Sequence, residues 1–325
     1  MRVLITGAGG FIGSHCTEAM VRAGHEVIAL THYNGAGSAG WLDAFPSEVR
    51  KGFQTVAGDI TDVEFVNDIS LKMDVIVNLA ALIAIPYSYV APRSYVNTNV
   101  IGTLNICEAA RNSGARLVQI STSEVYGTPD LVPITEDHPL KPQSPYAATK
   151  VASDQLALSY FRSFDLPVTV LRPFNTYGPR QSMRAVIPTI LGQMAQRKPR
   201  IDIGDLSPKR DFTFVNDTAN AIVSSAERDN LSGEVIQLGT GSAISIGDLI
   251  QLCAKITSYE IEVDVDVDRI RPPKSEVQIL LSDPAKAKRV LNWEAETGLE
   301  EGLTKTLNWM QDHPDKVQDS TKYWR

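Results

Sequence analysis

The chain has 325 residues, which is enough for one large domain or two modest ones. Hydrophobic residues make up 43% and charged residues 21%, an ordinary globular mixture that excludes disorder except at the ends. The net charge is −7 and no dense Lys/Arg block occurs, which argues against nucleic acid or an anionic membrane as the main partner. Anionic small molecules stay compatible with this composition, because a local arginine cluster can bind phosphate on an acidic protein.

Cysteine usage and the apolar runs bear on the cellular compartment. Cys16, Cys107 and Cys253 are far apart and form no CxxC pair, so we expect buried thiols rather than disulfides or a zinc site. The opening MRVLITGAGG passes from a short apolar run into glycines and lacks the long apolar region of a signal peptide. No apolar run reaches transmembrane length. We therefore expect a cytoplasmic protein with no membrane partner and no bound metal.

Short apolar, β-branched segments alternate with helix-like stretches along the first half of the chain. Six of them are predicted strands: residues 3–5, 27–30, 53–56, 75–77, 117–120 and 168–171. Strands that are apolar throughout suit a parallel sheet buried on both faces, and their spacing fits βαβ crossovers. The sequence therefore predicts an α/β fold with a Rossmann-type, doubly wound parallel sheet.

The second half of the chain has a different texture. After residue 171, prolines and glycines break up the segment, as in a loop-rich substrate-binding region. Residues 212–215 and 235–238 are strand-like and are candidates to rejoin the sheet. We therefore expect a smaller α/β substrate-binding domain, interleaved with the first. The larger domain is expected to span residues 1–173 and about 211–240, and the smaller one 174–210 and 241–325.

Two helix starts carry capping signals. Ser144 precedes Pro145, which predicts an N-cap with proline at the first helical position. Ser245 is followed three positions later by Asp248, which predicts a capping box with Asp as the less usual partner. Helices are therefore expected to begin at Pro145 and directly after Ser245.

Residues 6–13, TGAGGFIG, follow the first predicted strand and open a helix. Gly7, Gly10 and Gly13 have the spacing TGxxGxxG, which allows a tight turn and a close approach of the backbone to a pyrophosphate. Free N–H groups at the helix start then face the negative charge. A plain strand–helix turn needs one glycine, whereas this segment has four, so the pattern indicates a dinucleotide site.

The carboxyl ends of the second and third predicted strands bear on the choice of dinucleotide. Asp59 follows the third strand, and two roles stay open for it: accepting a hydrogen bond from an adenine amino group, or capping a turn or helix. The acid that usually ends the second strand and binds the ribose 2′-hydroxyl is missing, since residues 30–34 read LTHYN and the next acid is Asp43. No Arg follows closely either. A 2′-phosphate bound without a cation would cost more free energy than a 2′-hydroxyl bound without an acid. We therefore expect NAD, with NADP as the alternative.

Tyr146 and Lys150 form a Tyr-x-x-x-Lys pair just inside the helix predicted to start at Pro145. Residues four apart lie on one helix face, where the lysine ammonium lowers the pKa of the tyrosine by stabilising its phenolate. Such a tyrosine can take a proton from a sugar hydroxyl while hydride leaves the same carbon for a nicotinamide. The pair therefore predicts an oxidation site between the fifth and sixth strands.

The fifth predicted strand leads into residues 120–127, ISTSEVYG. A carboxylate at the carboxyl end of a central strand is costly to place there for stability alone, so we interpret Glu124 as functional rather than as a solvated loop residue. Thr122 is expected to hydrogen-bond the reacting hydroxyl. Once a neighbouring carbon becomes a ketone, its α-proton is acidic enough for Glu124 to remove it as a base.

Together, TGAGGFIG, STSEVYG and YAATK resemble the extended short-chain dehydrogenase/reductase superfamily, and the resemblance runs nearly end to end. Further matching motifs are GDI at 58–60, NTNVIGTLN at 97–105, RPFN at 172–175, KRDF at 209–212 and RIRP at 269–272. The resemblance implies a Rossmann-type domain, a bound dinucleotide, a nucleoside-diphosphate-sugar substrate and a homodimer formed through helices starting near Gly102 and Pro145.

The resemblance also implies individual contacts. Cofactor contacts are expected from Gly7, Gly10, Phe11, Ile12, Gly13, Asp59, Ile60, Leu79, Ala80, Ala81, Asn99, Tyr146 and Lys150. Substrate contacts are expected from Asn175 and, at the diphosphate, from Arg210 and Arg271. Arg184 is equally consistent with a substrate contact and with a structural ion pair.

The branch of the superfamily depends on Glu124. In 4-epimerases this position is usually small or neutral, whereas Glu124 resembles the 4,6-dehydratases and the UDP-glucuronate decarboxylases. In dTDP-glucose 4,6-dehydratases an Asp commonly precedes this Glu as the acid at O6, but here the residue is Ser123. Residues 82–89 and 180–188 are most similar to N-acetylglucosamine 4,6-dehydratases associated with legionaminic-acid-type sugars.

The resemblance implies a 4,6-dehydratase acting on UDP- or GDP-N-acetylglucosamine. Tyr146, assisted by Lys150 and Thr122, is expected to oxidise C4, and Glu124 to remove the C5 proton as water leaves from C6. Glu124 or Ser123 then supplies the proton to the leaving oxygen, and hydride returns to C6. Three alternatives stay open: a UDP-glucuronate decarboxylase with Arg184 facing the carboxylate, a 4-epimerase, and a non-catalytic dinucleotide-binding sensor.

Overall fold

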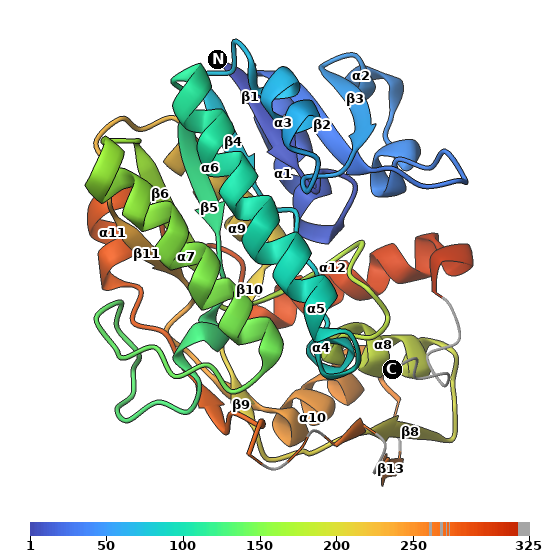
Figure 1. Ribbon diagram of the computed structural model, residues 1–325. Coiled ribbons are helices and arrows are strands. Elements are labelled where there is room, and N and C mark those ends of the chain that lie inside the picture. Colours follow the sequence, from blue (N-terminus) through green and yellow to red (C-terminus); the bar gives the residue numbers. More distant parts are fainter. Residues whose placement is uncertain (260–261, 267–268, 271, 273, 318–325) are drawn as a thin grey trace.

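The computed structural model describes residues 1–259, 262–266, 269–270, 272 and 274–317 (Figure 1). The predicted diphosphate contact Arg271 lies outside these residues.

Seven parallel strands form the central sheet, in the order β11-β6-β5-β4-β1-β2-β3. They are β1 (Arg2–Thr6), β2 (Glu26–His32), β3 (Phe53–Gly58), β4 (Val75–Asn78), β5 (Arg116–Ile120), β6 (Val168–Pro173) and β11 (Val235–Leu238). The chain starts at the middle of the sheet, runs outward to β3, and then crosses back to β4 and runs outward the other way. This reversal between β1 and β4 confirms the predicted doubly wound, Rossmann-type fold, and all six predicted strands belong to it.

Helices cover both faces of this sheet, each over its own hydrophobic core. On one face the core contains side chains of α1 (Phe11–Arg22), α9 (Val215–Ala226) and α11 (Ala285–Leu291). On the other face it contains side chains of α3 (Val63–Ser70), α6 (Gly102–Ser113) and α7 (Pro145–Phe164), and Figure 1 shows α6 and α7 crossing the near face side by side. The sheet is therefore buried on both sides, as its apolar strands require.

Both predicted helix starts are confirmed. Helix α7 begins at Pro145, and the hydroxyl oxygen of Ser144 accepts a hydrogen bond from the Ala147 N–H at 3.1 Å. Helix α10 (Ile246–Thr257) begins directly after Ser245, whose hydroxyl oxygen accepts from the Asp248 N–H at 3.0 Å. The side chain of Asp248 accepts in turn from the Ser245 hydroxyl. The first of these caps fixes the helix that carries Tyr146 and Lys150.

A long helical rod precedes β5. It consists of α5 (Pro92–Tyr95), the π-helical turn η2 (Val96–Ile101) and α6, and the residues at both junctions keep right-handed helical angles. The short helix α4 (Ile85–Val90) lies just before this rod. A π-helical turn holds one more residue per turn than an α-helix needs, and such turns occur often at functional sites.

A third hydrophobic core lies beyond the carboxyl edge of the sheet. It is built mainly from α8 (Val186–Ala195), α10 and α12 (Leu299–Asp312), which Figure 1 shows below the ends of the strands. Short strands join this part: β8 (Arg200–Ile203) pairs with β13 (Glu262–Val265), and β9 (Lys209–Arg210) lies between β12 (Ile244–Ser245) and β14 (Ile279–Leu280). The remaining short helices are η1 (Gly40–Ala44), α2 (Ser47–Arg50), η3 (Ser123–Tyr126) and η5 (Pro314–Lys316). The proposed residue boundaries of two domains stay a prediction.

One strand is used differently from the expectation. Residues 235–238 rejoin the central sheet beside β6, but β10 (Phe212–Phe214) pairs with β7 (Asn175–Tyr177) in a separate two-stranded sheet. The physical reason is aromatic packing. Phe212 and Phe214 make edge-on contacts with Tyr177, with ring centroids 6.1 and 5.7 Å apart, so this apolar run serves the third core.

Cys16, Cys107 and Cys253 are buried and unpaired, as predicted. None of the described helices has the length and apolar character needed to cross a bilayer. Within the described ranges, His, Cys, Asp and Glu form no group of three or more that could hold a metal ion.

Candidate active site

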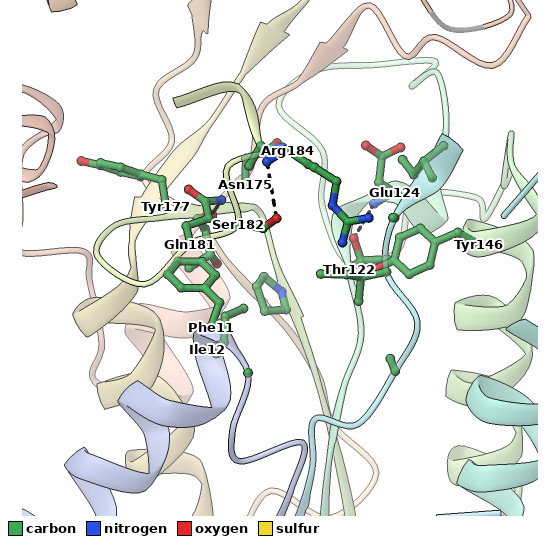
Figure 2. Close-up of a pocket in the computed structure, with 18 of the residues that line it drawn as sticks. Phe11, Ile12, Thr122, Glu124, Tyr146, Asn175, Tyr177, Gln181, Ser182 and Arg184 are labelled. Carbon is green, nitrogen blue, oxygen red and sulfur yellow. Dashed lines mark hydrogen bonds between the residues drawn. The ribbon is translucent and has the colours of Figure 1, made fainter. Parts of the chain in front are cut away.

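A cavity of about 800 Å³ lies at the carboxyl ends of the central strands. We group its lining residues by the part of the chain from which they come. Those of the strand ends and helix α7, called the sheet wall, belong to segments 7–13, 31–40, 79–87 and 120–124, with Tyr146 and Lys150. Those of the later loops, called the loop wall, belong to segments 173–189 and 203–212, with Ile246, Arg269 and Glu276. Figure 2 shows Thr122, Glu124 and Tyr146 on one side, Asn175 and Gln181 on the other, and Arg184 extending toward Thr122 and Tyr146. Ligands of doubly wound sheets bind at this edge, beside the topological switch.

The glycine loop has the geometry that its sequence predicts. Gly7 has φ of +68°, and a Cβ atom there would lie 2.9 Å from the Ala80 nitrogen. A Cβ atom on Gly13 would lie 2.1 Å from the Gly7 carbonyl oxygen. Gly10 is the N-cap of α1 and leaves the first turn of the helix without a side-chain cap. Larger residues at Gly7 and Gly13 would therefore collide with neighbouring backbone, so these glycines allow the tight turn that brings the chain to the N-terminus of α1.

Thr6 supports the cavity wall from behind and was not predicted from the sequence. Its hydroxyl oxygen accepts hydrogen bonds from the N–H groups of Leu79 and Ala80, at 3.1 and 3.0 Å, and its hydroxyl donates to Asn78 at 2.7 Å. It therefore joins the end of β1 to the end of β4, where Leu79, Ala80 and Ala81 line the cavity. A hydroxyl residue directly before the first glycine is the available signal.

Three predicted cofactor contacts are not among the lining residues. Asp59 accepts from the Thr61 N–H at 2.8 Å, and its Oδ2 is 3.8 Å from Nδ1 of His32, which lines the cavity. Ile60 is a buried core residue at 4% exposure. The structure therefore puts Asp59 one side chain away from the cavity and Ile60 in the core, and their cofactor contacts stay predictions.

Asn99, the third of these residues, is buried in the helical rod. Its amide nitrogen donates to the Leu82 carbonyl at 3.0 Å and to Thr149 at 3.0 Å, and its amide oxygen accepts from the Leu82 N–H at 2.8 Å. Asn99 therefore ties the loop after β4 to α7, the helix of Tyr146 and Lys150.

Asp43, the first acidic residue after β2, stabilises the loop that follows this strand. Asp43 accepts hydrogen bonds from the Ser38 hydroxyl and the Ala39 N–H, both at 2.9 Å. Asn34 adds two bonds to Ser38, one in each direction. As a result, His32, Asn34 and Ser38 line the cavity where a strand-end acid was expected.

Tyr146 and Lys150 lie on one face of α7, and both line the cavity although both are buried. Burial raises the pKa of Tyr146, and a hydrogen bond with Thr122 opposes this rise. Lys150 donates through Nζ to the Ile120 carbonyl at 2.5 Å, and burial lowers its pKa to about 8. At neutral pH the ammonium form of Lys150 therefore still predominates. The predicted lowering of the Tyr146 pKa is not observed, because burial and nearby negative groups raise it instead.

Ser123 and Glu124 follow β5 in the short helix η3, and both line the cavity. The Glu124 N–H donates to the Thr122 hydroxyl oxygen at 3.3 Å, which fixes the turn between the strand and the carboxylate. The charge of Glu124 also raises the pKa of Tyr146, which indicates that the two side chains are electrostatically close. The structure therefore brings all five predicted catalytic residues to one cavity.

Polar groups of the loop wall come from short segments. Asn175, on β7, lines the cavity, and its buried Oδ1 has no hydrogen-bond partner among the described residues. Gln181 also lines the cavity, although it was not predicted. Its amide nitrogen donates to the Thr176 carbonyl at 2.9 Å, but its buried Oε1 has no hydrogen-bond partner within the described ranges. Unsatisfied buried acceptors are costly, so these two oxygens are suited to receive ligand donors.

The cations of the loop wall differ in their surroundings. Arg210 is buried at 6% exposure and donates to Glu276 at 2.6 Å, and both residues line the cavity. Arg184 lines the cavity, as predicted for a substrate contact. Arg269 also lines it and pairs with Asp266 at 3.0 Å. Glu276 was not predicted, because only the fold brings it beside Arg210. Arg269 belongs to the RIRP motif, but only Arg271 of that motif was predicted as a contact.

The profile of the GDP-mannose 4,6 dehydratase family matches residues 4–306. The chain belongs to this family of nucleotide-sugar dehydratases and epimerases. The predicted membership of the extended short-chain dehydrogenase/reductase superfamily is thereby confirmed. The particular similarity to enzymes of legionaminic-acid-type pathways is not, and it stays a prediction.

Both reaction types occur among the relatives. A UDP-glucose 4-epimerase from Mycolicibacterium smegmatis is 34% identical, covering 96% of this chain and 99% of the relative. A dTDP-glucose 4,6-dehydratase from Mycobacterium tuberculosis is 32% identical, covering 96% and 94%. The structure of UDP-glucuronic acid 4-epimerase from Bacillus cereus in complex with UDP-glucuronic acid and NAD is 29% identical, with a TM-score of 0.86 and coverage of 96% and 99%. Family membership alone therefore does not choose between dehydration and epimerisation.

Proposed function

We propose that the chain is an NAD-dependent nucleoside-diphosphate-hexose 4,6-dehydratase, and that its substrate is UDP- or GDP-N-acetylglucosamine. The observation that carries the proposal is Glu124, which lines the same cavity as Thr122, Tyr146 and Lys150. Oxidation at C4 needs one base at the hydroxyl, whereas elimination across C5 and C6 needs a second base at C5. Glu124 supplies that second base.

The glycine loop fits a dinucleotide, because its tight turn depends on Gly7 and Gly13 and leads to the N-terminus of α1, which has no side-chain cap. NAD is supported by the related B. cereus structure, which contains it. It is also supported by the lining segments 7–13 and 31–40, which contain no Arg or Lys to bind a 2′-phosphate. When bound, NAD accepts hydride from C4 of the sugar and later returns it at C6.

Tyr146 performs the first proton transfer. Its phenolate takes the proton of the sugar 4-hydroxyl, while the Thr122 hydroxyl orients the reacting oxygen. The Lys150 ammonium, four residues along the same helix, is the proposed cation for this phenolate. Removal of this proton and of the C4 hydride leaves a 4-ketone, which makes the C5 proton acidic. The pair on α7 therefore prepares the substrate for the second base.

Glu124 performs the elimination. Its carboxylate takes the C5 proton, the C6 hydroxyl leaves, and the proton goes to the leaving oxygen from Glu124, or from Ser123 through a water. The product of elimination is a conjugated 4-keto sugar, which receives hydride at C6 and a proton from solvent at C5. The net change is loss of one water, and no external reductant is consumed.

The loop wall would hold the rest of the substrate. Arg210 and Arg271 are proposed to bind the diphosphate, and Arg210 lines the cavity beside Glu276. The free acceptor of Asn175 suits a sugar hydroxyl or amide donor. We also expect a homodimer formed through α6 and α7, which size-exclusion chromatography with light scattering would test.

One rival is favoured by a specific observation. Arg184 extends toward Thr122 and Tyr146 (Figure 2), where a cation would suit the carboxylate of UDP-glucuronate in a decarboxylase. A 4-epimerase is the other rival, since epimerases are among the relatives. The decarboxylase would use the same four residues as the dehydratase, whereas the epimerase would leave Glu124 without a role.

Mass spectrometry in deuterated water tests the proposal. The purified protein is incubated with UDP- and GDP-N-acetylglucosamine, without added reductant. Loss of one water with one deuteron incorporated is expected, and the nucleotide that reacts identifies the substrate. Unchanged mass with both compounds, followed by loss of carbon dioxide from UDP-glucuronate, would replace the dehydratase by the decarboxylase. A product without a 4-ketone would support epimerisation.

A further inference from the structure

A buried polar network lies one helical turn beyond Lys150. Asp154 follows Lys150 by four residues and Tyr146 by eight, so the three side chains share one face of α7. Its side chain is 0% exposed. Oδ2 accepts hydrogen bonds from the Ser121 hydroxyl at 2.8 Å and from Nε of Arg172 at 3.1 Å. Oδ1 is buried and has no hydrogen-bond partner within the described residues.

Ser121 connects this network to the reacting groups. It stands between Ile120, whose carbonyl accepts from Lys150 Nζ, and Thr122, whose hydroxyl bonds to Tyr146. By holding the Ser121 hydroxyl, Asp154 holds the strand end that positions both partners. Asp154 is not among the residues that line the cavity, so we assign it no direct contact with substrate or cofactor.

The ion pair between Asp154 and Arg172 is sealed from water, with side-chain exposures of 0% and 3%. Arg172 also donates to the Tyr126 hydroxyl at 3.0 Å and lies over the Tyr126 ring, 5.1 Å from its centroid. Buried ion pairs contribute little net stability, because the desolvation of both charges offsets their attraction. Stability alone is therefore a weak reason for an acid at this position.

Charged and polar side chains from several elements around this network shift the pKa values of Asp154, Lys150 and Tyr146. Arg172 of β6 and Lys150 of α7 lower the pKa of Asp154, but burial prevails and raises it. Asp154 raises the pKa of Lys150 against the stronger effect of burial. Glu124 of η3, Tyr95 of α5 and Asp154 itself raise the pKa of Tyr146. Asp154 is thus the acidic side chain that favours the charged form of Lys150.

We infer that Asp154 is a positioning residue for the oxidation step: its buried carboxylate fixes the 120–122 strand end and keeps a negative charge beside the Lys150 ammonium. The inference rests on the proposed function, since it assigns Asp154 to the Tyr146–Lys150 pair. Loss of the carboxylate removes stabilisation of the ammonium. Lys150 then gives up its proton at lower pH. The same loss also removes a charge that raises the pKa of Tyr146, so the titration of Lys150, and not that of Tyr146, reports the role of Asp154.

The first measurement needs no substrate. Protein labelled with ¹³C at lysine Cε is titrated by nuclear magnetic resonance, and the Lys150 signal is assigned by its disappearance in Lys150→Met. In Asp154→Asn we expect the Lys150 pKa to fall by about one unit or more from its value near 8. Asp165→Asn, an exposed substitution at the C-cap of the same helix, is the matched control and should leave this titration unchanged.

The second measurement follows the reduction of bound NAD after substrate is added, as a function of pH. In Asp154→Asn, the pH at which this rate falls on the alkaline side should decrease by the same number of pH units as the Lys150 pKa. We expect kcat to be reduced above neutral pH and KM to be unchanged. Tyr146→Phe distinguishes failure of the proposed function from failure of the role assigned to Asp154. If Tyr146→Phe still reduces NAD, the proposed function is wrong, but the titration of Lys150 still tests the role of Asp154.

Asp154→Asn leaves Arg172 without its partner and is at risk of not folding. Ser121→Ala is the second variant, because it removes one hydrogen bond to the carboxylate and leaves the ion pair whole. It should raise the pKa of Asp154 further, which weakens the support of Lys150 and lowers the lysine pKa by a smaller amount. A folded variant of either kind with the wild-type Lys150 titration and alkaline limb would overturn the inference.

Discussion

The two walls of the cavity are built from different kinds of structure. On the sheet wall, Thr6 and Lys150 make hydrogen bonds to backbone groups at strand ends, and Thr122 bonds to Tyr146. On the loop wall, the acceptors of Asn175 and Gln181 are buried without a partner among the described residues. The groups proposed to perform chemistry are thus held in place by the protein itself, whereas these two acceptors, proposed to contact the substrate, are available to ligand donors.

This contrast predicts that changes on the sheet wall alter kcat and cofactor binding, and that changes on the loop wall alter KM. Tyr146→Phe should have the largest effect, because it removes the base while keeping the ring that packs against Tyr95. We expect kcat to fall by about 10²–10⁴-fold, measured by product formation under saturating substrate. Unchanged NAD content of the purified protein is the control, and near wild-type turnover would remove the tyrosine from the mechanism.

Glu124→Gln should stop the reaction after its first step. The variant keeps Thr122, Tyr146 and Lys150, so C4 oxidation proceeds, but the C5 proton is not removed. We expect dehydration to slow by about 10²-fold while reduced nicotinamide accumulates on the enzyme, which absorbance spectroscopy detects. Full turnover without such accumulation would show that the second base lies elsewhere.

Gly13→Ala should weaken cofactor binding, because the new Cβ would lie 2.1 Å from the Gly7 carbonyl oxygen. The loop has to shift, which we expect to raise the Kd for NAD by about tenfold, equivalent to about 1.4 kcal/mol. Isothermal titration calorimetry measures this constant. Gly35→Ala is the matched control, since a Cβ there meets nothing within 4 Å. Equal Kd values for NAD in the two variants would show that the close contact between Gly13 and Gly7 does not matter for cofactor binding.

Arg184→Gln should have the smallest effect on activity, and it should act on KM rather than on kcat. The guanidinium comes from the loop wall, so its loss should remove the proposed charge-assisted substrate contact and leave the proton-transfer groups intact. We expect KM to rise by about tenfold, as for the loss of one such bond, with little change in kcat. A large fall in kcat at unchanged KM would mean that Arg184 belongs functionally to the sheet wall.

Features encoded locally could be predicted from the sequence. The glycine spacing, the cap at Ser144 and the Tyr146–Lys150 pair each depend on residues within a few positions of one another. The β-branched runs likewise indicated a sheet buried on both faces, and all of these features are confirmed in the structure.

Features that depend on contacts distant in sequence could not be predicted. Glu276 pairs with Arg210 across 66 positions, and Thr6 binds Leu79 and Ala80 across more than 70. The pairing of β10 with β7 follows from the packing of Phe212 and Phe214 on Tyr177, which no local pattern reveals. Asp59 and Ile60 were expected at the cofactor from a motif, but distance from the cavity is a property of the fold.

The π-helical turn η2 marks a place where this chain can change in length. Because η2 carries one residue more than α-helical geometry needs, deletion of a single residue between Val96 and Ile101 would turn it into ordinary α-helix. The segments on either side would keep their orientation, because the wider turn spreads the same rotation over one residue more. The contacts made inside the turn would change instead, and these include the bonds of Asn99 to Leu82 and Thr149. The extra residue therefore matters for the position of Asn99 rather than for the course of the rod.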